Sequence, residues 1–295
     1  MSISVWTYAW RHLTTTIQIP NVDLTGRTCI ITGANQGLSA SRLILAVRDT
    51  KKGNSAAARI RLTVPEYTGN MEVHQVDQSS FASVMSFIET VQRELDRLDM
   101  LILNAGTAGY AMLVLPKLAE TAELPPPPQS LAYKPHLVVV ASEAHELAKF
   151  AQQDETNLLE ALNDPQYYGN MEVYNTTKLL QVFMTREMAG LSRASNIIVN
   201  AVTPGLCKTH LRRDFPKFLD LFFYVIAWTP AFGSRSIVVA ALSDLPSTTY
   251  FSHGRAAPTS PFSMTDKAHL VQRKLWRELL GFWKGLAPEI QDVQD

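Results

Sequence analysis

The sequence has little of what marks a secreted, metal-bound or nucleic-acid-binding protein. Its 295 residues include only two cysteines, Cys29 and Cys207, too few for a disulfide framework, so we expect a reducing, cytoplasmic compartment. Basic and acidic residues number 27 each, and this balance gives no electrostatic footprint for nucleic acid. The histidines are scattered, so we expect no metal site.

Long apolar runs are also lacking. No stretch reaches the roughly 18 apolar residues that a membrane-spanning helix needs. Arg11 and His12 interrupt the N-terminal segment, so we expect no signal peptide. Residues 1–23 nevertheless carry Trp6, Tyr8 and Trp10. We expect a short arm or helix that packs its aromatics on the domain, and a membrane-surface anchor is the alternative.

The sequence does contain candidate catalytic residues, first of all Tyr174 and Lys178. Residues four positions apart lie one turn from each other on one helix face. A nearby ammonium stabilises a phenolate and lowers the pKa of the phenol, which then exchanges a proton near neutral pH. The same spacing also occurs on many solvated helix faces, so its meaning depends on the rest of the chain.

A glycine turn follows the first apolar run. Residues 28–32 predict a buried strand, and Gly33, Gly37 and Leu38 come directly after it. Glycines at this place let the backbone approach a pyrophosphate, whose charge then meets amides at a helix start. Ser39 stands where a third glycine is usual. A plain glycine turn is the alternative interpretation.

Strand and helix patterns then alternate along the chain. The expected strands are residues 28–32, 42–49, 73–77, 100–106, 136–141, 196–202 and 250–255, with helices at 56–62, 79–95 and from Tyr174 onwards. This alternation predicts an α/β fold with a parallel sheet covered on both faces. Arg48, near the end of the second strand, is placed to meet a ribose 2′-phosphate, or it is merely a solvated arginine.

The ordered set of motifs resembles the short-chain dehydrogenase/reductase family. The matching pieces are Thr32-Gly33-x-x-x-Gly37, Asp77, Asn104-Ala105-Gly106, Ser142, Tyr174-x-x-x-Lys178 and Pro204-Gly205. The chain is most similar to the retinol-dehydrogenase-like branch and to tailoring reductases of fungal secondary metabolism. The resemblance implies one Rossmann-like, doubly wound domain over residues 24–295, after the N-terminal arm.

The resemblance also implies roles for single residues. Ser142, Tyr174 and Lys178 would carry catalysis, with a ketone and a secondary alcohol interconverted on a lipophilic molecule. NADP(H) would be the cofactor. Its further contacts would be Gly33, Gly37, Leu38, Arg48, Asp77 beside the adenine, Asn104, the backbone near Cys207, and the Thr209 hydroxyl, besides Tyr174 and Lys178 themselves.

Two segments are shorter than the family pattern. Only residues 33–42 separate the first two strands, so the first crossover helix is expected to be missing. The helix after the fourth strand is also expected to be reduced, and no asparagine between Gly106 and Pro135 could complete the family's proton relay. Three explanations stay open: a trimmed working enzyme, an inactive relative that serves as a binding or scaffold protein, or a gene that lost two segments.

An apolar stretch at residues 215–228 lies inside an expected substrate lid of about residues 210–230. Such a lid would suit a lipophilic small molecule. Core packing and contact with a membrane surface are the alternatives. The reduced helix after the fourth strand often forms a dimer interface in the family, so the sequence leaves open whether the chain is a homodimer.

Overall fold

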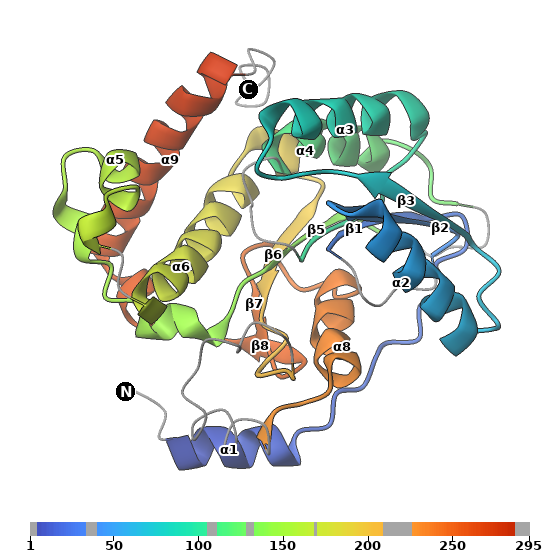
Figure 1. The fold of residues 1–295 in the computed structure, drawn as a ribbon, viewed down its shortest axis with the longest axis horizontal. Helices are drawn as coiled ribbons and strands as arrows, with labels where there is room; N and C mark the ends of the chain where they lie inside the picture. Colours follow the sequence, from blue (N-terminus) through green and yellow to red (C-terminus); the bar gives the residue numbers. More distant parts are fainter. Residues whose placement is uncertain are drawn as a thin grey trace.

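The described residues build an eight-stranded sheet that runs through the middle of the molecule (Figure 1). The computed structural model describes residues 5–33, 40–104, 111–127, 133–167, 170–208 and 226–286. The strands are β1 (Thr28–Thr32), β2 (Arg42–Val47), β3 (Asn70–Gln75), β4 (Met100–Leu103), β5 (His136–Val140), β6 (Ile198–Val202), β7 (Tyr250–Ser252) and β8 (Arg255–Ala257). Their order is β3-β2-β1-β4-β5-β6-β7-β8. From β1 the chain adds β2 and β3 on one side, and it then adds β4 to β8 on the other side. This doubly wound strand order confirms the predicted Rossmann-like fold class.

Strands β1 to β7 are parallel, and β8 pairs with β7 antiparallel. The single last strand predicted over residues 250–255 was therefore wrong in its extent. The chain turns back at His253 and Gly254, whose φ angles are 56° and 72°. The left-handed region is costly for His253 and easy for Gly254, so this pair makes a tight hairpin at the strand end.

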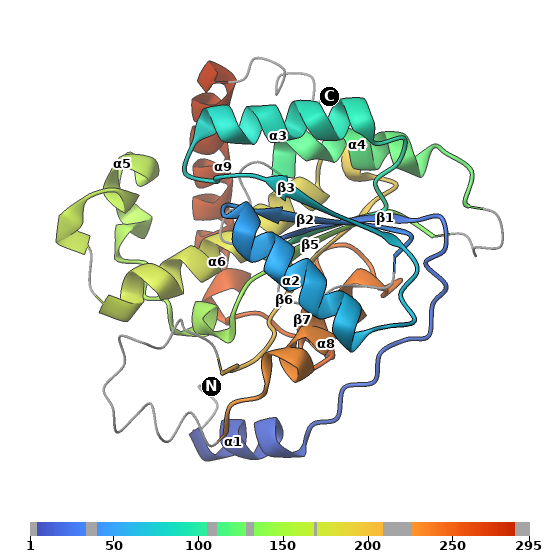
Figure 2. The same cartoon turned by 45° about the vertical axis from the view of Figure 1, so that its right-hand side comes forward.

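Neighbouring residues of each strand point to opposite sides, and both sides are buried. Ile30 and Leu101 belong to one core cluster, whereas Cys29 and Met100 belong to the other. Cys29 is thus a buried hydrophobic residue, as its apolar run predicted. The first face is covered by α3 (Phe81–Glu94), α4 (Ala111–Ala122), α6 (Asn170–Ala189) and α9 (Asp266–Leu286), and the second by α2 (Thr50–Thr63) and α8 (Pro230–Ala241) (Figure 2).

The smaller elements lie around these layers. Helix α5 (Leu158–Leu162) packs beside α9, and their side chains share a core cluster with α6 (Figure 1). These elements are α1 (Val5–Thr14), α5 and the 3-10 turns η1 (Glu143–Leu147), η2 (Ala151–Asp154), η3 (Pro165–Tyr167), η4 (Ser192–Ala194) and η6 (Phe262–Met264).

The connection from β1 to β2 is short for a parallel pair. The two strands are direct neighbours, with Thr28 opposite Arg42, and only nine residues, 33–41, join them. Parallel neighbours usually need a dozen or more residues, most of them in a helix. Of this connection the structure describes Gly33, Ala40 and Ser41, none of which is helical.

Some element boundaries differ from the sequence expectation for local reasons. Helix α2 begins at Thr50, six residues before the expected start, because the Asp49 carboxylate accepts hydrogen bonds from the Lys51 and Lys52 amides at 2.9 and 3.1 Å. The second strand therefore ends at Val47 and not at residue 49. Helix α6 begins at Asn170, which puts Tyr174 in its second turn.

The N-terminal helix α1 lies apart from the sheet, beyond α8 (Figure 1). Trp10 is 70% exposed, whereas His12 is fully buried. The expectation that Trp10 packs on the domain was therefore wrong. Two positions along a helix turn a side chain by roughly 200°, so only one of these two rings can face the domain. The extended segment after α1 places Ile17 in the core.

Candidate active site

Five predicted site residues follow the ends of five neighbouring strands. Gly33, Arg48, Asp77, Asn104 and Ser142 come one or two residues after β1, β2, β3, β4 and β5. Because these strands are parallel, all five lie along the carboxyl edge of the sheet, where α/β folds bind their ligands.

Asn104 ties the first half of this edge together. Its Nδ2 donates to the carbonyl oxygens of Thr32 and Gly33, both at 3.1 Å. Gly33 has a φ of 60°, so the chain turns there in a conformation that favours glycine. Gly37 and Leu38, the other predicted phosphate contacts, lie outside the described residues.

Arg48 and Asp77 end neighbouring strands. Arg48 is exposed, and its carbonyl oxygen accepts from Gln75 Nε2 at 3.4 Å. A hydrogen bond from the Ser79 hydroxyl, 2.6 Å from Asp77 Oδ1, is the main cause that lowers the pKa of Asp77. The edge thus presents a guanidinium beside a carboxylate that stays ionised.

Lys178 connects helix α6 to the end of β5. Its Nζ donates to the Val140 carbonyl oxygen at 3.0 Å and to Gln181 Oε1 at 2.9 Å. The same nitrogen lies 5.7 Å from the centre of the Tyr174 ring. Burial lowers the pKa of Lys178 to about 8. Lys178 is therefore held against the strand that leads to Ser142, and Tyr174 lies beside Lys178 on the same helix.

Ser142 begins the 3-10 turn η1 and caps it, since its Oγ accepts from the Ala144 amide at 3.2 Å. His145 holds the serine backbone: its Nδ1 donates to the Ser142 carbonyl oxygen at 2.7 Å, and its Nε2 accepts from the Ser260 amide at 3.0 Å. Burial lowers the pKa of His145, which favours this neutral tautomer. Sequence reasoning missed His145, although its position three residues after Ser142 was a usable local signal.

The loop of residues 203–208 follows β6 at the same edge. Cys207 is half-buried, with its Sγ 3.5 Å from the Pro204 carbonyl oxygen. The loop pairs with Trp228, whose amide donates to Leu206 and whose carbonyl accepts from the Lys208 amide, both at 2.9 Å. Thr209 lies outside the described residues, as does most of the predicted lid. Ile226, Ala227 and Trp228 of that stretch are buried in the core.

A second group that sequence reasoning missed joins His12, His253, Ser252 and Glu143 near this loop. His12 and His253 are 241 positions apart, so no local pattern could have paired them. The group brings the N-terminal helix to the edge that carries Ser142.

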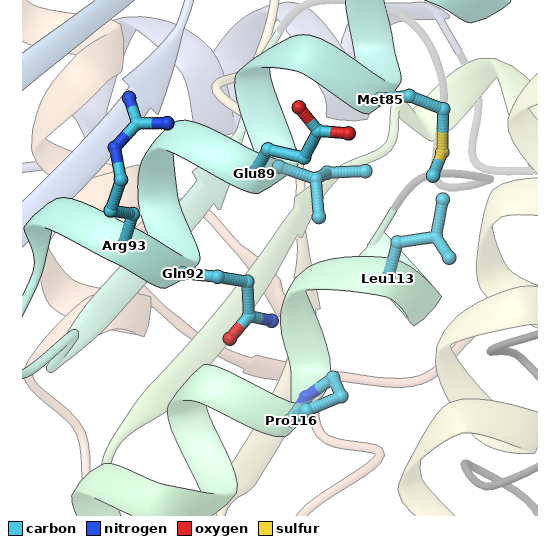
Figure 3. A pocket seen from close by; sticks show the side chains of 7 residues that line it. Met85, Glu89, Gln92, Arg93, Leu113 and Pro116 are labelled. Carbon is cyan, nitrogen blue, oxygen red and sulfur yellow. The ribbon is translucent and has the colours of Figure 1, made fainter.

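A pocket of about 530 Å³ lies elsewhere, between α3 and α4 (Figure 3). None of the predicted site residues lines it, and its walls are Met85, Ile88, Glu89, Gln92, Arg93, Leu113 and Pro116. Among the described residues, no group of three His, Cys, Asp or Glu side chains could hold a metal ion. In the same part of the chain, no helix is long and apolar enough to cross a membrane.

Comparisons with known proteins give the family. A family model described as enoyl-(acyl carrier protein) reductase matches residues 39–235. Short chain dehydrogenase FGM9 of Gibberella zeae is 30% identical over 315 residues, covering 95% of this chain and 92% of that protein. Short chain dehydrogenase sol3 of Alternaria solani is 34% identical, covering 75% and 86%. The chain belongs to the short-chain dehydrogenase/reductase family.

Solved structures agree on the fold. The structure of L-sorbose reductase from Gluconobacter frateurii, complexed with NADPH and L-sorbose, has a TM-score of 0.55 at 16% identity, with 80% of this chain and 98% of that chain covered. A 7α-hydroxysteroid dehydrogenase complexed with NADH has a TM-score of 0.56 at 16% identity, with 80% and 96% covered. At this identity the likeness concerns the fold alone.

Proposed function

We propose that the protein is an NADP-dependent oxidoreductase that interconverts a ketone and a secondary alcohol on a lipophilic small molecule. The observation that carries this proposal is the half-buried Lys178 ammonium, which joins the helix of Tyr174 to the end of β5 just before Ser142. A cation beside a phenol, at the carboxyl edge of a parallel sheet, is suited to proton transfer to a substrate oxygen.

The residues of this edge also fit a dinucleotide. Gly33 turns with a positive φ where a pyrophosphate would approach the backbone, and Asn104 holds that turn. The exposed Arg48 guanidinium, at the end of β2, suits the 2′-phosphate that distinguishes NADPH from NADH. The Asp77 carboxylate stands at the end of the next strand, on the side expected for the adenine.

In the proposed reaction, the hydride for the carbonyl carbon would come from NADPH held along this edge of the sheet. The Ser142 hydroxyl donates a hydrogen bond to the substrate oxygen and orients the carbonyl. Tyr174 gives its phenolic proton to the same oxygen as negative charge develops there, which yields the alcohol and a transient phenolate. The Lys178 ammonium stabilises that phenolate until a proton from solvent restores the phenol.

The proposed substrate class rests on the apolar stretch at residues 215–228 and on the fungal source of the relatives. We assign the substrate to lipophilic secondary metabolites. The low cysteine content, two in 295 residues, agrees with a cytoplasmic location. Peripheral contact with a membrane and assembly into a homodimer remain predictions.

An inactive relative that acts as a binding or scaffold protein is the second candidate. The nine-residue link between β1 and β2 favours it, because so short a link leaves little room for the helix whose first turn would hold the pyrophosphate. The alignment with the Gibberella zeae protein spans 315 positions, more than the 295 residues of this chain, so the relative has residues without a counterpart here.

Titration of NADPH fluorescence separates the two candidates. The enzyme account expects saturable binding, and it expects Arg48→Ala to weaken NADPH binding roughly 10-fold to 100-fold, since a hydrogen bond to a charged group contributes about 1.5–3 kcal/mol. NADH binding should be unchanged. The matched control is Arg59→Ala, because Arg59 is also an exposed arginine but lies in helix α2, away from the end of β2. Absence of NADPH binding at millimolar cofactor would favour the scaffold candidate.

A further inference from the structure

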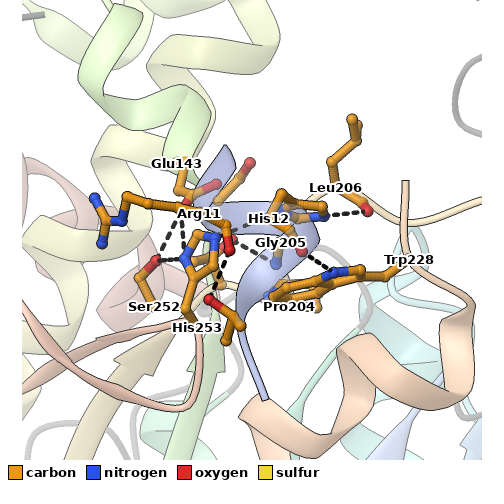
Figure 4. A network of polar contacts seen from close by, with 12 residues as sticks. Arg11, His12, Glu143, Pro204, Gly205, Leu206, Trp228, Ser252 and His253 are labelled. Atoms are coloured by element: carbon orange, nitrogen blue, oxygen red, sulfur yellow. Dashed lines mark hydrogen bonds and ion pairs between the residues drawn. The ribbon is translucent and has the colours of Figure 1, made fainter. Parts of the chain in front are cut away.

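A buried polar network joins the N-terminal helix α1 to the loop of residues 203–208 (Figure 4). His12 is its centre. The His12 side chain is fully buried, and His253 in the β7–β8 hairpin is 4% exposed. Buried polar groups are kept where their hydrogen bonds are made, so the contacts of His12 indicate what it holds in place.

His12 contacts the loop directly and also through Trp228. Its Nε2 lies 3.0 Å from the Leu206 carbonyl oxygen, and its ring stacks on Trp228 with the ring centres 3.8 Å apart. Trp228 Nε1 in turn donates to the His12 carbonyl oxygen at 2.6 Å. Trp228 also pairs through its backbone with Leu206 and Lys208. A side chain of α1 is thus part of the packing that shapes this loop.

Gly205 leaves the room for this contact. A Cβ on Gly205, whose φ is 74°, would lie 2.8 Å from both His12 Cε1 and the Trp228 ring. A larger residue would push His12 away from Leu206. The Pro204-Gly205 pair therefore suits both the turn of the loop and the close approach of the histidine.

In the other direction the network reaches the residue next to Ser142. His12 Nδ1 lies 3.4 Å from His253 Nε2, and His253 Nδ1 lies 2.7 Å from Ser252 Oγ. Ser252 Oγ donates to Glu143 Oε1 at 2.7 Å. Glu143 directly follows Ser142 at the start of η1. The network therefore spans the loop after β6 and the turn after β5.

The protonation of His12 follows from its partners. A carbonyl oxygen only accepts, so Nε2 carries the proton that is shared with Leu206. Burial lowers the pKa of His12, which favours the neutral ring. Nδ1 is then an acceptor that faces His253 Nε2. The property that the loop needs from residue 12 is one donor at the position of Nε2.

We propose that His12 is a positioning residue that holds the loop of residues 203–208 in register with Ser142. The segment before the first strand is then a functional part of the catalytic end. This inference rests on the proposed function, which assigns the loop near Cys207 to the nicotinamide.

The test compares three variants of the full-length protein. His12→Phe keeps a ring to stack on Trp228 but removes the donor, whereas His12→Gln places an amide donor near the position of Nε2. Thr14→Ala is the control on the same helix, since among the described residues its hydroxyl donates within α1, to the Trp10 carbonyl oxygen. We expect His12→Phe to weaken NADPH binding by threefold to tenfold, with His12→Gln and Thr14→Ala within twofold of the wild type.

Thermal melting is measured beside binding to separate positioning from folding. If His12→Phe does not yield folded protein, His12→Asn takes its place, because its shorter amide does not reach Leu206. We call the variant that lacks a donor to Leu206, His12→Phe or in its place His12→Asn, the donor-less variant. Wild-type NADPH affinity in the donor-less variant would overturn the inference. Equal loss of affinity in the Gln and the donor-less variants would also overturn it, since the donor would then not matter.

A second measurement keeps the inference apart from the proposed function. Hydrogen exchange of the Lys208 amide, which donates to Trp228, needs no cofactor. We expect faster exchange in the donor-less variant than in His12→Gln. If the wild type binds no NADPH, the proposed function fails, and this exchange difference still decides whether His12 holds the loop. Equal exchange rates would contradict the positioning role.

Discussion

At the scale of the residue, Lys178 has the most consequential environment. Its ammonium is half-buried, it donates hydrogen bonds to a carbonyl oxygen and an amide oxygen, and burial lowers its pKa to about 8 from an ordinary value of 10.5. Burying this charge costs stability, and the charge is what the Tyr174 phenolate needs. Stability and function therefore conflict at this position.

The conflict predicts a pH dependence of folding. Between pH 8 and about 10.4 the unfolded chain binds the Lys178 proton and the folded chain does not, so the contribution of Lys178 to the unfolding free energy rises with pH. Lys178→Met lacks this contribution. Relative to the variant, the wild type should gain about 2 kcal/mol between pH 7 and pH 10 in urea unfolding, less if solvent screens the charge. If the unfolding free energies of the wild type and of Lys178→Met differ by the same amount at pH 7 and at pH 10, the pKa of Lys178 is not lowered in the folded protein.

At the scale of the element, helix α8 and the loop of residues 203–208 touch without space between them. A Cβ on Gly233 would lie 2.2 Å from Cys207 Sγ and 2.8 Å from the Pro204 carbonyl oxygen. Gly233→Ala must therefore move the loop or the helix, which we expect to cost about 1–3 kcal/mol of folding free energy and to weaken NADPH binding.

Gly281→Ala is the matched control, because a Cβ there meets nothing within 4 Å. It replaces a glycine inside helix α9, so we expect it to gain up to about 1 kcal/mol without changing cofactor affinity. Thermal melts and NADPH titrations of both variants provide the comparison. If Gly233→Ala is as stable as the control and binds NADPH with the same affinity, the close contact between α8 and the loop is refuted.

Sequence reasoning succeeded where the signal was local. The apolar runs predicted the strands, and the ends of those strands predicted the row from Gly33 to Ser142 along one edge. It failed where the determinant was distant or came from a single cap. Helix α2 starts earlier than expected because Asp49 caps it, and the ring that packs on the domain is His12 and not Trp10. The pairing of His12 with His253 depends on the tertiary fold, which no spacing pattern contains.

At the scale of the whole molecule, the proposed cofactor contacts and the proposed proton-transfer groups lie at different places along the sheet. The ends of β1, β2, β3 and β4 and the loop after β6 carry groups proposed to hold the dinucleotide. The end of β5 and helix α6 carry the groups proposed for proton transfer. The short link after β1 concerns only the cofactor contacts. Turnover can therefore be lost while cofactor binding is kept, but not the reverse, so binding and turnover are each measured.

The most direct test of the central claim is NADPH oxidation by the wild type and by Tyr174→Phe with a panel of aromatic and alicyclic ketones. A positioned general acid contributes about 10²–10⁴-fold to the rate, so the account predicts that Tyr174→Phe loses at least 10²-fold in turnover. NADPH affinity should stay within twofold of the wild type. A variant that oxidises NADPH at the wild-type rate with any ketone that the wild type reduces would contradict the account.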